Sequence, residues 1–292
     1  MKSIKKLYHK LKSFYFLNIT LIKKLYYKLQ SFYFIVRGMK PWTSGYWHYK
    51  TLTIKNLLYS QSFDPFSLPK GFGYRVDERV VEYPWFFSRL PSGDGKLLDA
   101  GSVLNVDFIL SHSKLQSKKV FISTLAPESE SFWDKGVSYV FEDLRNSCFK
   151  DDYFDWIASL STIEHIGLDN TMLYTADPSK KENHSNTYIQ AIREYHRMLK
   201  PGGVLYLSFP YGKHQNRKWF QIFDGPMIDE IIEIFKPTKH TTFYYKYESE
   251  GWEISTRKES KDATYFDIHT ESDYDSDFAA ASRAIVCLEL VK

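Results

Sequence analysis

The chain has 292 residues, of which 43% are hydrophobic and 25% are charged. This composition is typical of a soluble globular protein and excludes a disordered or collagen-like chain, and the length suits one main domain with an appendage. Two cysteines, Cys148 and Cys287, are too few for a disulfide framework or a cysteine-based zinc site, which favours a reducing, cytoplasmic setting.

Charge is distributed unevenly along the chain. The net charge is +4, and the ten positive charges of residues 1–40, with no acid among them, leave the rest of the chain at −6. A uniformly basic surface for nucleic acid is therefore not expected.

The first forty residues contain an internal repeat. Segments 5–16 and 23–34 match at 10 of 12 positions, and they are offset by 18 residues, which is about five helical turns. In the second copy the apolar residues follow the i, i+3, i+4 spacing of one helical face: Ile22, Leu25, Tyr26, Leu29, Phe32 and Tyr33. Residues 1–40 are therefore predicted to form a basic amphipathic helical extension, either one long helix or a hairpin.

The use of this extension stays open at the level of sequence. Lysines interrupt the apolar run, so it lacks the roughly 20 apolar residues of a membrane-spanning helix, and it lacks the apolar centre of a signal peptide. A basic amphipathic helix can lie on an anionic membrane surface, here the inner face of the membrane. The alternative is that the apolar face packs on the core or on a partner.

Residues 41–95 are predicted to be a loop-rich connecting cap, because prolines and glycines recur in this region. Asp77 is well placed to cap a helix that continues to about Leu90. That helix either packs on the edge of the main sheet or serves as a lid over a ligand.

Residues 96–292 show short apolar runs that alternate with helical patterns. The predicted strands are 96–102, 119–124, 137–141, 154–160, 204–209, 244–247 and 282–291. A helix that begins near Asn186 or Thr187 is stopped by the Pro-Gly-Gly at 201–203. Alternation of this kind predicts an α/β fold, a Rossmann-like doubly wound and mostly parallel sheet, with ligands bound at the carboxyl ends of the strands.

Three segments of this region resemble the motifs of one family. They are LDAGS at 98–102, FDWI at 154–157 followed by STIEHIG at 161–167, and MLKPGGVL at 198–205. From about Asp77 to its end, the chain is similar to class I S-adenosylmethionine-dependent methyltransferases of the type 11-like group. The resemblance implies a Rossmann-like domain with S-adenosylmethionine as its cofactor.

The resemblance also implies a set of cofactor-binding residues: Asp99, Ala100, Gly101, Ser102, Asp143, Leu144, Ser161 and Thr162. In this reading Gly101 lets the backbone approach the cofactor, Asp99 accepts from its amino group, and Asp143 pairs with the adenine amino group. The backbone N–H of Leu144 contacts the ring, and Ser161 and Thr162 line the methionine side.

The sequence departs from the family pattern at two places. Val103 and Asn105 stand where the first loop usually has glycines. The second strand runs into Thr124-Leu125-Ala126-Pro127, where the family has an acid for the ribose hydroxyls. The ribose contact is therefore left without an assigned residue.

Catalysis of methyl transfer requires alignment of donor and acceptor, and a hydroxyl acceptor also needs a base. The candidates are His165, Glu164 and Tyr211, with His165 first because a neutral imidazole accepts a proton near pH 7. The alternative is a structural histidine that caps the turn. No metal site is predicted.

Together these observations predict an S-adenosylmethionine-dependent methyltransferase that O-methylates a sugar or glycan precursor at the cytoplasmic membrane face. The expected partners are a small-molecule or glycan acceptor and an anionic membrane surface bound through residues 1–40, and nucleic acid is not expected. Two alternatives stay open: a non-catalytic binding or scaffold protein with the same fold, and an RNA methyltransferase.

Overall fold

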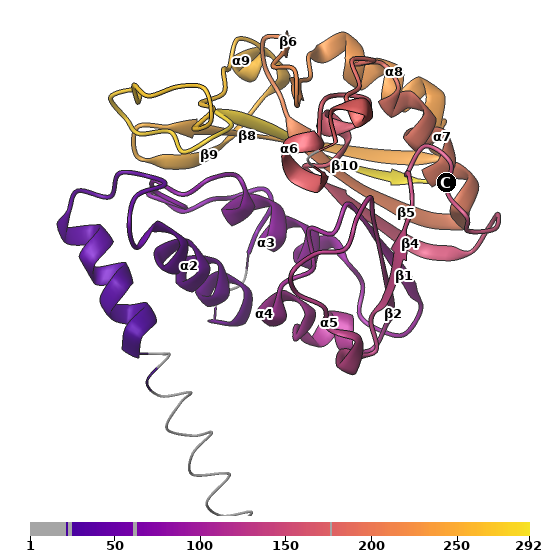
Figure 1. The fold of residues 1–292 in the computed structure, drawn as a ribbon, viewed down its shortest axis with the longest axis horizontal. Helices are drawn as coiled ribbons and strands as arrows, with labels where there is room; N and C mark the ends of the chain where they lie inside the picture. The colour runs from indigo at the N-terminus through magenta and orange to yellow at the C-terminus, as the bar shows by residue number, and fades with distance from the viewer. Residues whose placement is uncertain (1–21, 23–24, 61–62, 176) are drawn as a thin grey trace, which may run out of the picture.

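The computed structural model describes residues 22, 25–60, 63–175 and 177–292 (Figure 1). The first copy of the repeat, residues 5–16, lies outside these described residues. In the second copy residues 25–34 are helical, within a helix that runs from 25 to 36. The helix prediction is therefore confirmed for the described part of the second copy.

An eight-stranded sheet forms the centre of the protein, in the order β3-β2-β1-β4-β5-β10-β8-β9. Its strands are β1 (Lys96–Ala100), β2 (Lys119–Thr124), β3 (Ser138–Phe141), β4 (Phe154–Leu160), β5 (Leu199–Pro210), β8 (Lys239–Glu248), β9 (Gly251–Ser255) and β10 (Ala284–Val291). The first five pair in parallel, and β10 runs antiparallel between β5 and β8. The order 3-2-1-4-5 is that of a doubly wound fold, so the predicted Rossmann-like class is confirmed.

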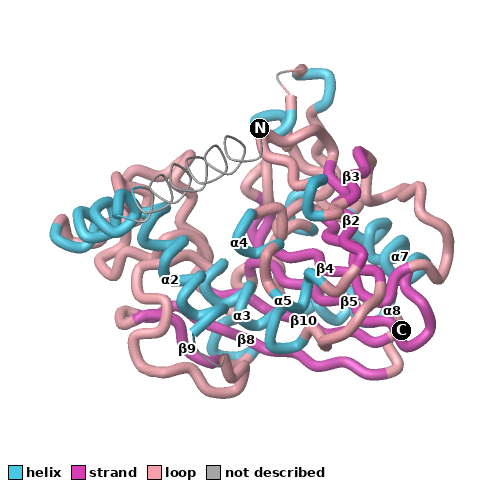
Figure 2. Tube along the Cα trace, turned by 90° about the horizontal axis from the view of Figure 1, so that it is seen from below, coloured by secondary structure: helices cyan, strands magenta, loops and turns pink. Residues whose placement is uncertain are grey.

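Helices cover both faces of this sheet (Figures 1 and 2). The longer ones are α2 (Tyr46–Ser60), α3 (Arg79–Arg89), α7 (Tyr188–Met198) and α8 (Gly225–Phe235). The short ones are α4 (Asp107–Leu110), α5 (Ser113–Gln116), α6 (Thr171–Tyr174), α9 (Arg257–Ser260) and the 3-10 turns η1 (Trp133–Lys135), η2 (Ile163–His165) and η3 (Pro178–Lys180). A small hairpin, β6 (Gln215–Asn216) and β7 (Gln221–Ile222), completes the fold.

Two hydrophobic cores lie on the two faces of the sheet because successive residues of a strand point in opposite directions. In β1, Leu97 packs in the cluster that holds Val80 and Trp85 of α3, whereas Leu98 packs in the cluster that holds Ile192 of α7. The result is a three-layer α/β/α arrangement.

The expectation of a loop-rich region at 41–95 is wrong for one segment. The helix α2 spans Tyr46–Ser60, and the prolines and glycines that suggested loops, such as Pro41 and Pro65, lie outside it. Another element that the strand and helix patterns did not predict is α8, which begins directly after its N-cap residue Asp224.

The helix α3 begins at Arg79, with Glu78 at the N-cap position and Asp77 one residue earlier. Asp77 still satisfies the helix start, because its Oδ1 accepts the N–H of Arg79 at 3.2 Å. Its Oδ2 accepts from the Tyr46 hydroxyl at 2.8 Å and from Lys50 Nζ at 2.6 Å, which ties α2 to α3. Most of α3 is buried against the sheet, so this helix is a layer of the core.

One fully buried carboxylate joins α3 to the middle of the sheet. Glu82 Oε2 pairs with Arg79 Nη1 at 2.5 Å. Its Oε1 accepts from the Ser161 hydroxyl at 2.5 Å and from the Ser208 hydroxyl at 2.7 Å. Ser161 directly follows β4 and Ser208 lies in β5, so Glu82 fixes α3 against the loop that leaves β4.

Replacement of Glu82 by alanine is expected to lower the free energy of unfolding by about 3–5 kcal/mol, because it leaves the Arg79 guanidinium without its buried partner. The matched control is Glu289→Ala, which removes a partly exposed partner of Arg89 in the same helix and should cost about 1 kcal/mol. Urea denaturation measures both. Equal losses would mean that the Glu82 network does not anchor α3.

Candidate active site

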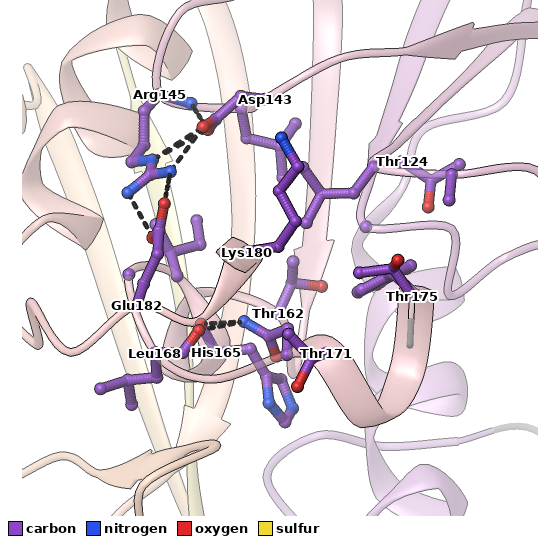
Figure 3. Close-up of a pocket in the computed structure, with 18 residues that line it drawn as sticks. Thr124, Asp143, Arg145, Thr162, His165, Leu168, Thr171, Thr175, Lys180 and Glu182 are labelled. Atoms are coloured by element: carbon purple, nitrogen blue, oxygen red, sulfur yellow. Dashed lines mark hydrogen bonds and ion pairs between the residues drawn. The ribbon is translucent and has the colours of Figure 1, made fainter. Parts of the chain in front are cut away.

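A cavity of about 470 Å³ opens at the carboxyl ends of four parallel strands (Figure 3). Gly101 follows β1, Thr124 ends β2, Asp143 follows β3 and Thr162 follows β4, and all four residues line this cavity. Its volume is within the range of about 300–1,000 Å³ typical of small-molecule sites. It lies where β1 is flanked by β2 and β4, which is the switch point of strand order where doubly wound proteins bind ligands.

Glycine is required at 101 for two reasons. Its φ of +123° is unfavourable for a residue with a side chain, and a Cβ atom would lie 2.1 Å from Thr162 Oγ1. The loop after β1 therefore packs directly on the loop after β4, and the two form one wall of the cavity.

The carboxylate of Asp99, which the motif assigns to the amino group of the cofactor, is bonded by its own loop in the structure. Asp99 is fully buried, and its carboxylate accepts the N–H of Val103 at 3.2 Å and the N–H of Leu104 at 2.7 Å. Burial raises the pKa of Asp99 to about 7 against the effect of these two hydrogen bonds. Asp99 holds the shape of the loop and does not line the cavity.

The neighbours of Gly101 are not among the residues that line the cavity. Ala100 is buried in β1, and Ser102 adopts a left-handed conformation with a φ of 65°. The buried Ser102 hydroxyl has no hydrogen-bond partner among the described residues.

Asp143 belongs to a charged cluster on one side of the cavity, opposite Thr124 (Figure 3). Arg145 Nε lies 3.0 Å from both Asp143 carboxylate oxygens, and its Nη1 and Nη2 each lie 2.7 Å from a Glu182 oxygen. Partial burial opposes ionisation, but the hydrogen bonds from Arg145 prevail and lower the pKa of Asp143. Asp143 is thus held as a carboxylate beside Leu144, which also lines the cavity.

The segment between β4 and α7 covers the cavity, and its part beyond His165 was not predicted to contribute. Its lining residues beyond His165 are Ile166, Gly167, Leu168, Asn170, Thr171, Tyr174, Thr175, Lys180 and Glu182. The pair of Glu182 with Arg145 ties this segment to the far wall. Its signal in the sequence is the length of the connection, residues 161–187, because ordinary connections rarely exceed about 12–15 residues.

His165 lies at the end of η2 and lines the cavity. Its Nδ1 is 2.9 Å from the Trp219 carbonyl oxygen, and its ring packs on the Trp219 ring at 5.1 Å. Because a carbonyl only accepts, Nδ1 carries the proton and Nε2 keeps its lone pair in the neutral ring. Burial lowers the pKa of His165 to about 4, so the ring is neutral near pH 7.

The other two predicted bases do not line the cavity. Glu164 is buried, and its Oε1 lies 4.0 Å from His165 Nε2. Burial raises the pKa of Glu164 well above its usual range, which favours the protonated carboxyl and disfavours a role as base. Tyr211 is buried too, and its hydroxyl donates to the Arg257 carbonyl oxygen at 3.0 Å.

The structure therefore brings together five of the predicted site residues: Gly101, Asp143, Leu144, Thr162 and His165. Six others are not among the residues that line the cavity: Asp99, Ala100, Ser102, Ser161, Glu164 and Tyr211. Ser161 is turned away because its hydroxyl donates to Glu82.

Two polar atoms at the lining have no partner in the described part of the chain. They are the Thr124 hydroxyl and the Asn170 side-chain carbonyl oxygen, both buried. Buried polar atoms are normally hydrogen-bonded, so these two indicate that the cavity takes a polar ligand.

Two further results bear on the described residues alone. They contain no group of three or more His, Cys, Asp or Glu side chains that could hold a metal ion. None of the described helices is long and apolar enough to cross a membrane.

Comparison with known proteins gives no family model that matches and no curated protein that matches. Among solved structures, the chain is similar to 1,6-didemethyltoxoflavin-N1-methyltransferase from Burkholderia thailandensis, with 14% identity over 72% of this chain and 76% of that chain and a TM-score of 0.44. It is similar to an S-adenosylmethionine-dependent methyltransferase from Thermotoga maritima, with 15% identity over 76% and 90% and a TM-score of 0.44. The [4+2]-cyclase SpnF is 15% identical over 67% and 74%, with a TM-score of 0.43. The assignment of the fold rests on the strand order of this chain itself.

The His165 ring is expected to stay neutral between pH 5 and pH 8, since burial lowers its pKa to about 4. An NMR titration of the histidine side chains measures this, and His165→Asn identifies the signal by its loss. A ring that titrates near its ordinary pKa of about 6.5 would contradict the buried geometry.

The same pKa has a consequence for stability. The unfolded chain binds a proton at His165 below about pH 6.5 and the folded chain only near pH 4, so the stability contributed by the neutral ring is lost as the pH falls between these values. The difference in unfolding free energy between wild type and His165→Asn should therefore shrink by up to about 3 kcal/mol from pH 7 to pH 4. Urea denaturation of both proteins at several pH values measures it.

Proposed function

We propose that this protein is an S-adenosylmethionine-dependent methyltransferase. One observation carries the proposal: residues that match the family's motifs, such as Gly101, Asp143 and Thr162, line a single cavity although they come from distant parts of the chain. The cavity lies at the switch point of a doubly wound sheet, where such folds bind nucleotide-like ligands.

The lining fits the polar groups of this cofactor. The Asp143 carboxylate would accept from the adenine amino group, because Arg145 keeps it ionised. The Thr124 hydroxyl, buried and without a protein partner among the described residues, would bond the ribose in place of the missing acid. Gly101 and Thr162 would border the amino-acid end. When bound, S-adenosylmethionine supplies a methyl group on a positively charged sulfur.

His165 is the base that the geometry favours. Its Nε2 carries a lone pair at neutral pH, and it is the one predicted base that lines the cavity. With a pKa near 4, the His165 ring is too weak a base to ionise the acceptor hydroxyl before methyl transfer begins. It is sufficient once the hydroxyl oxygen has begun to bond carbon, because the protonated ether that forms is a far stronger acid than imidazolium. His165 would thus orient the acceptor hydroxyl and remove its proton late.

The acceptor that we propose is a hydroxyl of a sugar or glycan precursor, methylated at the cytoplasmic face of the membrane. The basic segment of residues 1–40 supports this location, because it is chemically suited to anionic lipid. The net charge of −6 on the rest of the chain disfavours an RNA substrate. Val103 and Asn105 in the first loop favour the second candidate, a binding or scaffold protein that retains the fold without catalysis.

Cofactor binding separates these two candidates. Isothermal titration calorimetry of the full chain with S-adenosylmethionine should show micromolar affinity, and Gly101→Val should weaken it at least about 100-fold, because the new side chain collides with Thr162. The control is Gly136→Val, which also has a positive φ but has no atom within 4 Å of a Cβ. Absence of binding by a folded wild-type chain would favour the scaffold candidate.

Replacement of His165 by alanine should leave the affinity for S-adenosylmethionine within about threefold and lower methyl transfer about 100-fold or more, as expected for loss of a general base. The assay follows radiolabelled methyl groups into sugar nucleotides and lipid-linked sugars. A matched control is Tyr211→Phe, which removes a hydroxyl outside the cavity. Full activity of His165→Ala would exclude His165 as the base.

A further inference from the structure

The helix at residues 25–36 contacts the rest of the protein mainly through one side. Phe34 is only 1% exposed, and its ring packs against Tyr46 at 5.7 Å and Tyr49 at 5.3 Å. Ser31 is buried on the same side, and a Cβ at Gly45 would lie 2.2 Å from the Gln30 carbonyl oxygen. The helix is therefore held close to α2 by its Ser31 and Phe34 side (Figure 1).

The side that faces away from the protein is apolar. We call it the outer stripe, and it consists of Ile22, Leu25, Tyr26, Leu29, Phe32, Tyr33 and Val36, all exposed. At about 100° per residue these seven side chains span about 120° of the helix, with Leu29 near the centre. Ser31 and Phe34 lie about 140–160° away from Leu29. At one edge of this face the Tyr26 ring packs against the His48 ring of α2 at 5.3 Å, but Leu25, Leu29, Phe32 and Val36 stay largely exposed. Most of the apolar face predicted from the sequence is thus not used for packing on the described core.

Exposure on this scale requires a partner. Leu25, Leu29, Phe32 and Val36 are 57–62% exposed, and water disfavours large apolar side chains gathered on one surface. The stripe is too narrow for a helix that crosses a bilayer, but its width is that of a helix lying in the plane of a membrane surface.

The basic residues beside the stripe indicate which kind of partner covers it. Around the helix axis, Lys28 lies about 40° beyond Phe32, at one edge of the stripe. Arg37 lies about 20° beyond Tyr26, at the other edge. The whole of residues 1–40 adds to this with ten basic residues and no acid. Long basic side chains beside an apolar face can place their charges at lipid headgroups while the face is buried.

We propose that the outer stripe docks on an anionic lipid surface, with the helix parallel to the membrane. This inference rests on the membrane location in the proposed function and names the surface that provides it. Lipid binding itself needs neither the cofactor nor the cavity. It commits the exposed face to phospholipid headgroups of negative charge rather than to a second copy of the chain.

The test compares two variants of the full chain that add the same charge to the same helix. Leu29→Glu changes the centre of the stripe, and Ile35→Glu changes an exposed residue outside it. In cosedimentation with phosphatidylcholine vesicles containing phosphatidylglycerol, wild type and Ile35→Glu should bind alike, and Leu29→Glu should bind at least about tenfold more weakly. Binding should also weaken as salt is raised.

Three results would overturn the proposal. They are absence of vesicle binding by wild type, equal loss in both variants, and equal binding to vesicles of phosphatidylcholine alone. Sedimentation without lipid tests whether a second copy of the chain covers the stripe instead. A wild-type dimer that dissociates on Leu29→Glu would assign the stripe to that second copy. Thermal melting verifies that both variants fold. Calorimetry with S-adenosylmethionine on Leu29→Glu keeps this result separate from the cofactor proposal, because loss of lipid binding should leave cofactor affinity unchanged.

Discussion

The position of the cavity depends on a carboxylate that has no access to water. A buried charge is tolerated only where donors surround it, and Glu82 obtains its donors from three places: Arg79 in its own helix, Ser161 after β4 and Ser208 in β5. These bonds hold Ser161 in a left-handed conformation with a φ of 39°. The chain therefore leaves β4 in a direction that brings Thr162 and His165 to the cavity.

The requirement that buried charges be surrounded by hydrogen-bond donors divides the polar groups around the site into two sets. Most of the acids already have protein partners: Asp99 accepts from its own loop, and Asp143 and Glu182 share Arg145. The atoms left without a described partner at the lining are neutral, as at Thr124. A ligand of this cavity thus meets a preformed frame in which the charges are balanced, and it adds hydrogen bonds to neutral groups.

The sequence predicted the parts of the fold that local pattern determines. Strands such as 119–124 and the helix that ends before 201–203 were recovered because burial on both faces and stop signals are visible in neighbouring residues. It did not predict which motif residues face the cavity. The direction of Ser161 depends on Glu82, which is 79 residues away in the chain, and that of Asp99 depends on how the loop after β1 folds back onto it. It also missed the cover formed by residues 166–182, whose only local signal is its length.

The helix at 25–36 shows in another way what the spacing of apolar residues in a sequence cannot predict. Its spacing correctly indicated one apolar face, and the usual inference is that such a face packs on a core. Here the small contact through Ser31 and Phe34 suffices, because Gly45 allows the backbones to approach closely. Docking through a narrow side leaves the wide apolar side free. The excess of positive charge lies at this same end of the chain, because residues 1–40 hold ten basic residues and no acid. The two properties that a lipid surface requires are therefore concentrated in one element, separate from the chemistry at the ends of the strands.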